Sequence, residues 1–440
     1  MKSKLFLMVV FVGLLVSSCK KEIETVFGPG HHDPKGNHHL KIAIVSDIHY
    51  LDPSLIRNGG AEGTAFQNYL DQDPKLVQYS SLIFRNVVEQ LKADRPDIVL
   101  VPGDITKDGE KIGHQAIAGH LTKLRMAGIK VYVVPGNHDI NNAKAKRYDG
   151  NNDFPVEMTS KADFETIYGD FGYNNAIARD PNSLSYVVQP TPGFRIIGID
   201  ASKYEEYGPS GDVAAGRIKP ATLTWMLAQL AEAKQQNITI FAMMHHNLIE
   251  HYAGQSQLDP GYVIDDWQNV AHSLMDAGLK IIFTGHYHAN DISAYSHNGN
   301  ELIDIQTGSL VTAPSPYRMV TMKPTQLDIS SRTVKSIATS LPGGLPFPAY
   351  ANLFLSQKLD GYFSHFLVDR FGAPPELATI AAPLFRNGIM AHFAGDENLP
   401  AEEQEKINAL GTLSPDLAGI VTILWTDLGI KDNETNVKYK

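Results

Sequence analysis

Short apolar runs that each end in aspartate, asparagine or histidine constrain the fold of this chain most. Five such runs occur between residues 40 and 290. The polar clusters that follow them are Asp47-Ile48-His49, Gly103-Asp104, Gly136-Asn137-His138-Asp139, His245-His246 and Gly285-His286-Tyr287-His288. The runs themselves resemble strands that are buried on both faces. Segments with a helical spacing of apolar residues lie between them, and this alternation predicts an α/β architecture.

The expected elements can be placed along the chain from these patterns. Strands are expected at residues 41–45, 97–101, 129–134, 194–199, 238–244 and 279–283, and short strands at 291–295, 301–306, 318–322 and 326–329. Helices are expected at residues 80–91, 112–126, 220–234 and 267–277. In open α/β sheets, ligands bind beyond the carboxyl ends of the strands. The five polar clusters are therefore expected to meet in one site.

The segment before residue 40 carries targeting signals rather than fold information. Residues 1–18 begin with a short basic stretch and continue with an apolar run of Leu5 to Val16, which is too short to cross a bilayer and predicts a secretory signal peptide. Val16-Ser17-Ser18-Cys19 resembles a bacterial lipobox, so Cys19 is the expected lipidation site. Residues 19–39 are expected to form a flexible tether. The predicted location is the bacterial cell envelope, periplasm or outer surface, after export across the inner membrane.

Membrane attachment is expected only through that lipid anchor, since no other segment reaches 18 apolar residues. Four histidines of the tether, His31, His32, His38 and His39, can be read as metal scavengers or as parts of a linker without bound metal, and the linker is favoured.

Residues 341–440 differ from the segment 40–340 in composition and in the spacing of their apolar residues. A Pro/Gly-rich linker from Leu341 to Pro348 is followed by apolar residues at helical spacing, among them Leu355, Leu359 and Phe363. Residues 375–393 and 420–428 are also expected to be helical. We expect a small C-terminal helical appendage whose aromatic stripe packs as core rather than binding a ligand.

The polar clusters offer the donor atoms of a metal centre. Burying so many ionisable groups costs several kcal/mol each unless they are paired or bound to metal. The donors are carboxylates, imidazoles and an amide oxygen, without thiolates, a set that suits Mn, Fe, Zn or Mg. Seven such ligands exceed the needs of one ion. Two ions that share one bridging carboxylate would use all of them.

The order of the clusters resembles the signature of the calcineurin-like metallophosphoesterase superfamily, over about residues 40–326. The resemblance implies a β-sandwich flanked by helices and the hydrolysis of phosphate esters by attack of a metal-bound hydroxide. It assigns the ligands Asp47, His49 and His288 to one metal, Asn137, His245 and His286 to the other, and Asp104 to both as a bridge.

The same resemblance makes His138 the general acid that protonates the leaving group, and Asp139 the residue that orients it. His245 is preferred over His246 as the ligand. The sequence departs from the family pattern after Asp104: Thr106 stands where an acid is common, and an acid, Asp108, follows later. Asp108 is either a residue that supports the site or a turn residue before Gly109. For His251, a position facing the substrate and a position on the surface remain equally open.

The formal charge of −10 disfavours nucleic acid as a partner, because the general field of an acidic chain repels polyanions. A small phosphomonoester or phosphodiester is the expected substrate, since a local metal site can override that field. A non-catalytic binding or assembly protein that retains the fold is the alternative, and it is disfavoured because every ligand cluster is intact. The sequence predicts no oligomeric state.

Overall fold

The computed structural model describes residues 39–58 and 63–440, and within them two large β-sheets carry the site. The six-stranded sheet has the order β16 (Glu434–Lys438), β15 (Gln326–Thr333), β14 (Pro316–Met322), β1 (Leu40–Ile44), β3 (Ile98–Pro102) and β4 (Lys130–Val134). Its last three strands run parallel, whereas β14, β15 and β16 pair antiparallel. The signal peptide, the lipidation site Cys19 and nearly all of the predicted tether lie outside the described residues.

The second sheet has seven strands, and a third, small sheet has three. The seven-stranded order is β12 (Ile292–His297), β13 (Asn300–Gln306), β11 (Ile281–Thr284), β10 (Thr239–Met244), β9 (Phe194–Ile199), β8 (Tyr186–Thr191) and β7 (Ala178–Arg179). The small sheet joins β2 (Ile56–Arg57), β5 (Lys146–Asp149) and β6 (Asn152–Pro155).

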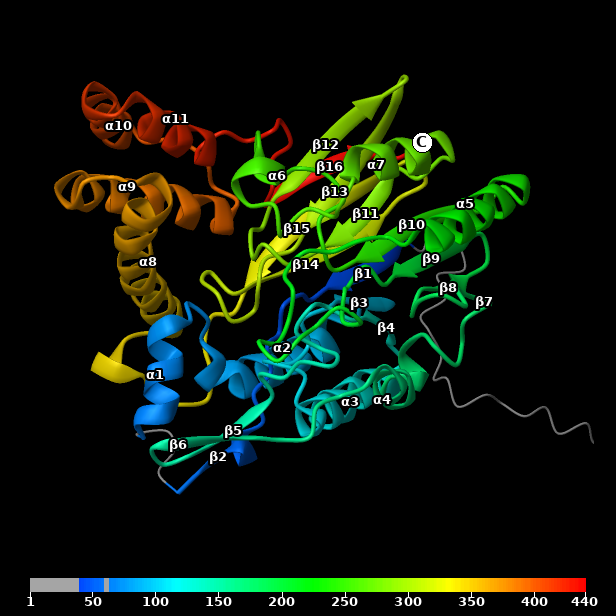
Figure 1. Cartoon of the computed structure of the whole chain (residues 1–440). Helices are drawn as coiled ribbons and strands as arrows, with labels where there is room; N and C mark the ends of the chain where they lie inside the picture. Colours follow the sequence, from blue (N-terminus) through cyan, green and yellow to red (C-terminus); the bar gives the residue numbers. More distant parts are fainter. Residues whose placement is uncertain (1–38, 59–62) are drawn as a thin grey trace, which may run out of the picture. The chain divides into compact units, whose positions relative to one another are not determined.

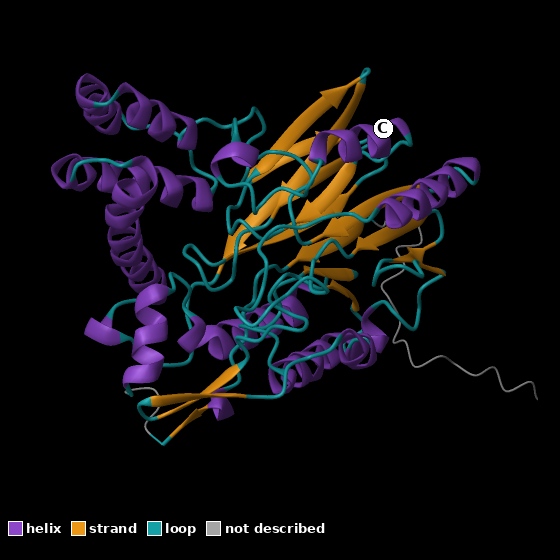
Figure 2. Ribbon diagram, in the orientation of Figure 1, coloured by secondary structure: helices purple, strands orange, loops and turns teal. Residues whose placement is uncertain are grey.

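Side-chain alternation along the strands explains why the two large sheets pack on each other (Figure 2). In β10, Phe241 and Met243 belong to the core cluster that also contains Ile42 and Leu100 of the six-stranded sheet. Ala242 lies on the opposite face of β10, in a separate cluster with side chains of α5 (Pro220–Gln235) and α7 (Trp267–Asp276). Successive strand residues point to opposite faces, so one strand serves both layers.

Helices cover the sandwich, as the sequence predicts (Figure 1). Those that precede β13 and have not yet been named are α1 (Thr64–Gln72), α2 (Ser80–Asp94), α3 (Lys111–Met126), α4 (Lys161–Ile167) and α6 (Gln255–Leu258). Single 3-10 turns occur at Pro53–Leu55, Val77–Tyr79, Gly169–Phe171 and Pro342–Gly344. The predicted fold class, an α/β sandwich flanked by helices with a C-terminal helical region, is confirmed.

The C-terminal region is helical over α8 (Phe347–Phe371), α9 (Pro375–Ala394), α10 (Ala401–Leu413) and α11 (Pro415–Leu424). Its aromatic stripe is core, as predicted, because Leu355, Leu359 and Phe363 are buried and join the main cluster. The last helix ends at Leu424, four residues before the predicted end. After it the chain returns to the six-stranded sheet as β16, a strand that helical periodicity does not reveal.

None of the helices in the described part of the chain combines the length and the apolar character that a membrane span requires.

Candidate metal centre

The predicted ligands lie directly after the strands that the sequence indicates. Asp47 and His49 follow β1, Asp104 follows β3, and Asn137 with His138 follows β4 of the six-stranded sheet. His245 follows β10, and His286 with His288 follows β11 of the seven-stranded sheet. Both sheets thus deliver donors to the same edge of the sandwich, as the topology of parallel strands requires.

Left-handed backbone geometry turns several of these side chains toward one another. The non-glycine residues Asp47, His49, Asp104, His286 and His288 have φ angles of 51°, 41°, 46°, 76° and 66°. Such conformations cost on the order of 1–3 kcal/mol each and persist where the surrounding structure enforces them. Five such residues in one cluster indicate that the surrounding structure holds the backbone in a strained conformation in order to place these side chains.

Two glycines of the motifs permit close approach of the loops. A Cβ at Gly136 would lie 2.2 Å from Oδ1 of Asp104, and a Cβ at Gly285 would lie 2.4 Å from Oδ2 of Asp47. Any side chain at these positions would displace a carboxylate ligand. The glycines of Gly-Asn-His-Asp and Gly-His-x-His are therefore required by the packing of the centre.

The first ligand group consists of Asp47, His49 and His288, whose donor atoms all lie within 4.8 Å of one another. Nε2 of His49 lies 3.2 Å from Nε2 of His288, and Nε2 of His288 lies 3.5 Å from Oδ1 of Asp47. Burial holds the pKa of His49 well below its usual value, so its ring is neutral and presents a lone pair. Two imidazole nitrogens that face each other beside a carboxylate fit a shared cation.

The second ligand group consists of Asp104, His245 and His286. Nε2 of His245 lies 3.3 Å from Oδ2 of Asp104 and 3.1 Å from Oδ1 of Asn137, so the asparagine oxygen joins this group as predicted. Burial lowers the pKa of His286 to about 3, which keeps this ring neutral as well. The donor set of carboxylate, amide oxygen and imidazole suits a divalent or trivalent metal ion.

Hydrogen bonds from outside the two groups fix the histidine rings. Nδ1 of His245 donates to the carbonyl oxygen of Pro102 at 2.8 Å, and Nε2 of His286 donates to the carbonyl oxygen of Gly261 at 3.0 Å. Nδ1 of His288 lies 3.0 Å from Oγ1 of Thr312. Each bond leaves the other ring nitrogen for the centre, which is the usual way that proteins orient ligating histidines.

Asp104 links the two ligand groups. Its Oδ2 lies 3.5 Å from Nε2 of His49, which belongs to the first group, and 3.3 Å from Nε2 of His245, which belongs to the second. Its Oδ1 accepts a hydrogen bond of 2.9 Å from the backbone nitrogen of His138. Asp104 is 2% exposed. This carboxylate stands where a bridge between two ions is expected.

His138 lies beside the ligands and keeps access to solvent, with 17% of its side chain exposed. Nε2 of His138 lies 3.9 Å from Oδ2 of Asp104 and 3.9 Å from Oδ2 of Asp212, while Nδ1 lies 3.0 Å from Oδ1 of Asp108. Burial lowers the pKa of His138, but Asp104 and the hydrogen bond to Asp108 outweigh it and raise the pKa to about 9.

The predicted orienting role of Asp139 is wrong, because its carboxylate faces the loop after β3 rather than His138. It accepts backbone hydrogen bonds from Ile105, Thr106 and Gly136 at 2.8–3.2 Å. Within the described part of the chain, its carboxylate shares neither a hydrogen bond nor an ion pair with the ring of His138. Asp108 takes the orienting position. Asp139 instead fixes the loop that carries Asp104.

The structure also places two further histidines, His246 and His251, whose positions the sequence left open. His245 rather than His246 lies in the ligand group; Nε2 of His246 donates to the carbonyl oxygen of Ala214 at 2.9 Å. Neither location left open for His251 is correct: it is fully buried against Asp291 and Asp304.

The structure adds three residues that the motifs do not indicate. Oδ2 of Asp212 accepts a hydrogen bond of 3.1 Å from the amide nitrogen of Asn137, which turns the asparagine oxygen toward His245. The hydroxyl of Tyr207 donates to the backbone oxygen of Asn137 at 2.8 Å. Lys75 is paired with Asp73 at 3.4 Å; burial lowers its pKa, but Asp73 first, then Asp108 and Asp104, raise it. They belong to loops without a recognisable motif, so only the folded chain brings them to the site.

Comparison with known families matches this geometry to a defined class. The model of the calcineurin-like phosphoesterase family matches residues 40–290, more than half of the chain, and the chain belongs to that family. The matched segment contains every predicted ligand and ends just beyond His288. The chain is accordingly a metal-dependent phosphoesterase by class.

Solved structures resemble the chain at low sequence identity. A dimetal phosphatase from Danio rerio is 16% identical with a TM-score of 0.47, covering 67% of this chain and 96% of its own. A purple acid phosphatase isolated from yellow lupin (Lupinus luteus) seeds is 13% identical with a TM-score of 0.40, covering 67% of this chain and 52% of its own. No curated protein matches the sequence.

Proposed function

We propose that the chain hydrolyses a small phosphate ester at a dinuclear metal centre, with His138 as the general acid. The single observation that carries the proposal is the position of Asp104 between the two ligand groups, within 3.5 Å of a histidine of each. One carboxylate so placed can serve two ions at once. Mn, Fe, Zn and Mg all suit the oxygen and nitrogen donors.

The first group would hold one ion through Asp47, His49 and His288, and the second would hold another through Asn137, His245 and His286. When bound, such ions polarise the phosphoryl oxygens and make water a nucleophile near neutral pH. The protein's own contribution is to aim the ring nitrogens inward and, at His49 and His286, to keep the rings neutral by burial.

His138 holds the proton that the leaving group needs. Its Nδ1 is tied to Asp108, so its Nε2 is the atom that faces the centre and can donate. The nearby carboxylates favour the protonated ring, as the raised pKa shows. An alkoxide leaves poorly unless it is protonated, and general acid catalysis of this kind contributes about 10²–10⁴-fold.

The experiment that tests this proposal is a turnover screen of the purified chain loaded in parallel with Mn, Fe, Zn and Mg. The substrates are p-nitrophenyl phosphate, bis-p-nitrophenyl phosphate, nucleotides, cyclic nucleotides and glycerophosphodiesters. We expect hydrolysis of a monoester or a diester that disappears with chelator and returns with metal. Absence of hydrolysis in every metal form would favour a binding or assembly protein of the same fold.

We also propose a location in the bacterial cell envelope, with the chain anchored by lipid on Cys19. The support is the lipobox-like sequence Val16-Ser17-Ser18-Cys19 and the basic and apolar segment before it. A tether of residues 19–39 would hold the phosphoesterase near the membrane surface without inserting it. Substrates would then be small phosphorylated molecules outside the cytoplasm.

A further inference from the structure

A second group of metal-type side chains lies beneath the C-terminal helices, apart from the centre described above. Asp291 precedes β12, His392 belongs to α9, and Glu397 follows α9. One donor atom from each lies within 4.8 Å of the others. Nδ1 of His392 is 2.8 Å from Oε1 of Glu397 and 3.8 Å from Oδ2 of Asp291.

These separations match the edges of a metal coordination shell. Four ligands held tetrahedrally about 2.0–2.1 Å from zinc stand about 3.3 Å apart, and the two measured separations bracket that value. Asp291, His392 and Glu397 are 1%, 2% and 9% exposed, so the site is almost dry. A small movement of side chains would place all three donors on one ion.

Asp291 supplies an atom with no other partner. Its Oδ1 accepts from His251 and Ser293, whereas its Oδ2 is buried without a hydrogen bond and is directed at His392. A buried carboxylate oxygen left without a partner costs free energy unless a cation or proton reaches it. This oxygen is the independent sign that the group lacks a ligand.

The acids around the group, Asp291, Glu397 and Asp432, outnumber the two buried bases beside them, Arg318 and His251. Asp432 lies beside Glu397, and its Oδ1 accepts from the backbone nitrogen of Ile292 at 2.6 Å. The guanidinium of the buried Arg318 donates to backbone carbonyl oxygens and to Ser331 rather than to a carboxylate, although its charge acts on Asp432 and Asp291. His251 pairs with Asp291 through Oδ1, and Asp304 and Asp291 raise its pKa to about 10 although burial lowers it.

Burial shifts the pKa values of Glu397, Asp432 and His392 toward their uncharged forms. Burial, with Asp291 nearby, raises the pKa of Glu397 to about 8, and burial with Asp291 and Glu397 raises that of Asp432 to about 9. Burial also lowers the pKa of His392, so its imidazole is neutral and can act as a ligand. The pKa of Asp291 moves the other way: burial raises it, but the charge of His251 outweighs burial and lowers it, so this carboxylate stays ionised.

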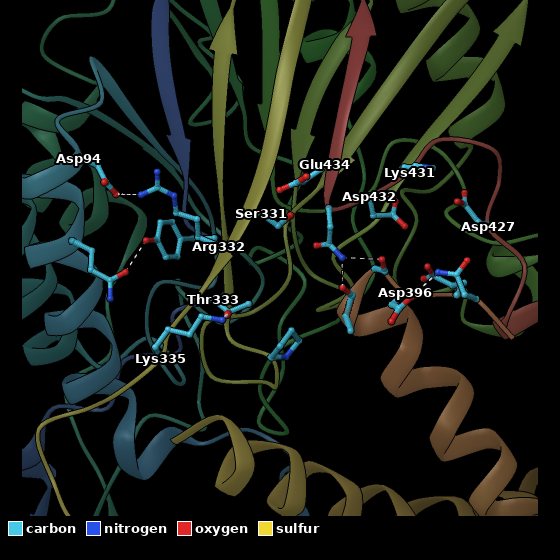
Figure 3. A pocket seen from close by; sticks show the side chains of 18 of the residues that line it. Asp94, Ser331, Arg332, Thr333, Lys335, Asp396, Asp427, Lys431, Asp432 and Glu434 are labelled. Carbon is cyan, nitrogen blue, oxygen red and sulfur yellow. Dashed lines mark hydrogen bonds and ion pairs between the residues drawn. The ribbon is translucent and has the colours of Figure 1, made fainter. Parts of the chain in front are cut away.

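A pocket of about 1270 Å³ reaches the edge of this group, because Glu397, alone among the three ligands, lines it (Figure 3). Glu397 and Asp432 line it together with Asp396, Asp427 and Glu434. Figure 3 shows Asp396, Asp427 and Asp432 gathered where the loop after α9 approaches the start of β16. The basic residues Arg332, Lys335 and Lys431 also line the pocket, but the acids outnumber them, and a net negative lining favours entry of a positive ion.

We infer that Asp291, His392 and Glu397 form a third metal site, structural in role, which binds a divalent cation of the Zn²⁺ type. The ion joins the C-terminal helices to the segment that follows His288. Three protein ligands, from two parts of the chain far apart in sequence, would then fasten the helical region to the sandwich.

The number of zinc ions bound per chain of the purified protein tests this site independently of any enzymatic activity. After loading with Zn²⁺ and removal of excess, we expect Glu397→Gln and His392→Gln to bind one ion fewer per chain than the parent. Asp396→Asn removes a charge from the same loop without removing a ligand, and we expect it to match the parent. Equal zinc content in the parent and in well-folded Glu397→Gln would overturn the inference.

Anomalous diffraction decides the matter if the variants fail to fold. Crystals of the unaltered chain, grown with Zn²⁺ and measured at the zinc absorption edge, should show a peak between Asp291, His392 and Glu397. Density without such a peak would overturn the inference and would identify the group as a protonated hydrogen-bond network. Peaks near Asp104 report on the catalytic centre separately, so the two proposals fail independently.

Discussion

Oδ1 of Asp108 lies 3.0 Å from Nδ1 of His138, and its other oxygen pairs with Nζ of the buried Lys107. Asp108 helps to raise the pKa of His138, together with Asp104. Asp108→Asn removes that negative charge, so the protonated ring becomes less favourable and its pKa falls. We expect the alkaline limb of the pH–rate profile to move to lower pH, because the general acid must carry its proton.

The matched control for this prediction is Asp139→Asn. Asp139 supports the loop after β3 through backbone hydrogen bonds and does not touch His138, so its removal should lower stability and leave the alkaline limb in place. An unchanged limb in Asp108→Asn would show that Asp108 does not tune the proton donor.

His138→Ala should keep its metals and lose turnover in a manner that depends on the leaving group. An alkyl leaving group needs the proton, so its rate should fall toward the upper part of the roughly 10²–10⁴-fold range. A p-nitrophenolate leaves readily as an anion and should show a much smaller defect. His286→Ala is the comparison, since it should lose metal and fail on both substrates. Equal defects and lost metal in His138→Ala would instead make His138 a ligand.

Asp104→Ala should lose both ions of the catalytic centre, because its Oδ2 serves both ligand groups. Elemental analysis of the purified variant measures this directly. Asp108→Asn provides the control, with a carboxylate removed nearby and the ions retained. Two catalytic ions remaining in Asp104→Ala would contradict the bridged centre.

Protonation of His114 should destabilise the fold in acid. This ring is fully buried, with its nitrogens near the hydroxyl of Tyr168 and the backbone oxygen of Asp139, and burial lowers its pKa to about 3. Below the usual value of 6.5 the unfolded chain takes the proton first, so stability declines as pH falls from about 6.5 to 3, by up to about 1.4 kcal/mol per pH unit.

Urea unfolding of the unaltered chain and of His114→Gln, from pH 7 to pH 4, measures this contribution. Other groups titrate over the same range in both proteins, so only the difference between the two curves reports on His114. The unaltered chain should lose stability more steeply. Parallel curves would show that folding leaves the pKa of His114 unchanged.

Cys19→Ala should release the chain from the membrane fraction of a bacterial host. Two or more acyl chains are needed for stable anchoring, and the sequence offers no second apolar span. Fractionation of the full-length protein and of a form without residues 1–19 gives the comparison. Membrane association of the shortened form would point to a surface of the folded domain instead.

The strand-end pattern predicts an α/β fold and one shared site because each ligand stands next to a strand in the sequence, whereas the sandwich and the division of the ligands into two groups rest on the family resemblance. His49 and His288 are distant along the chain, yet each belongs to a local motif, and parallel topology brings the motifs together. The contact between Asp108 and His138 is not visible in the sequence, because Asp139 is the acid next to His138 along the chain, whereas Asp108 lies 30 residues before it. Only the direction of the loop after β3 distinguishes them.

The group of Asp291, His392 and Glu397 illustrates what a sequence pattern cannot give. His392 stands within a helical stripe of mostly apolar residues, and Glu397 lies in a polar loop, so neither appears exceptional. The two residues meet Asp291 only because α9 packs against the segment after β11. Packing between separate elements is specified by the whole core rather than by a local motif.

The pairing of β16 with β15 changes how the C-terminal helices should be regarded in protein engineering. Ser330 pairs with Glu434 and Gln326 with Lys438, so the two strands are antiparallel neighbours, and everything between Thr333 and Glu434 is in effect one very long hairpin connection. A stop codon after the linker would strip the sheet of its edge strand as well as its helices. Replacing the connection with a short turn would excise the helices and leave the sheet intact.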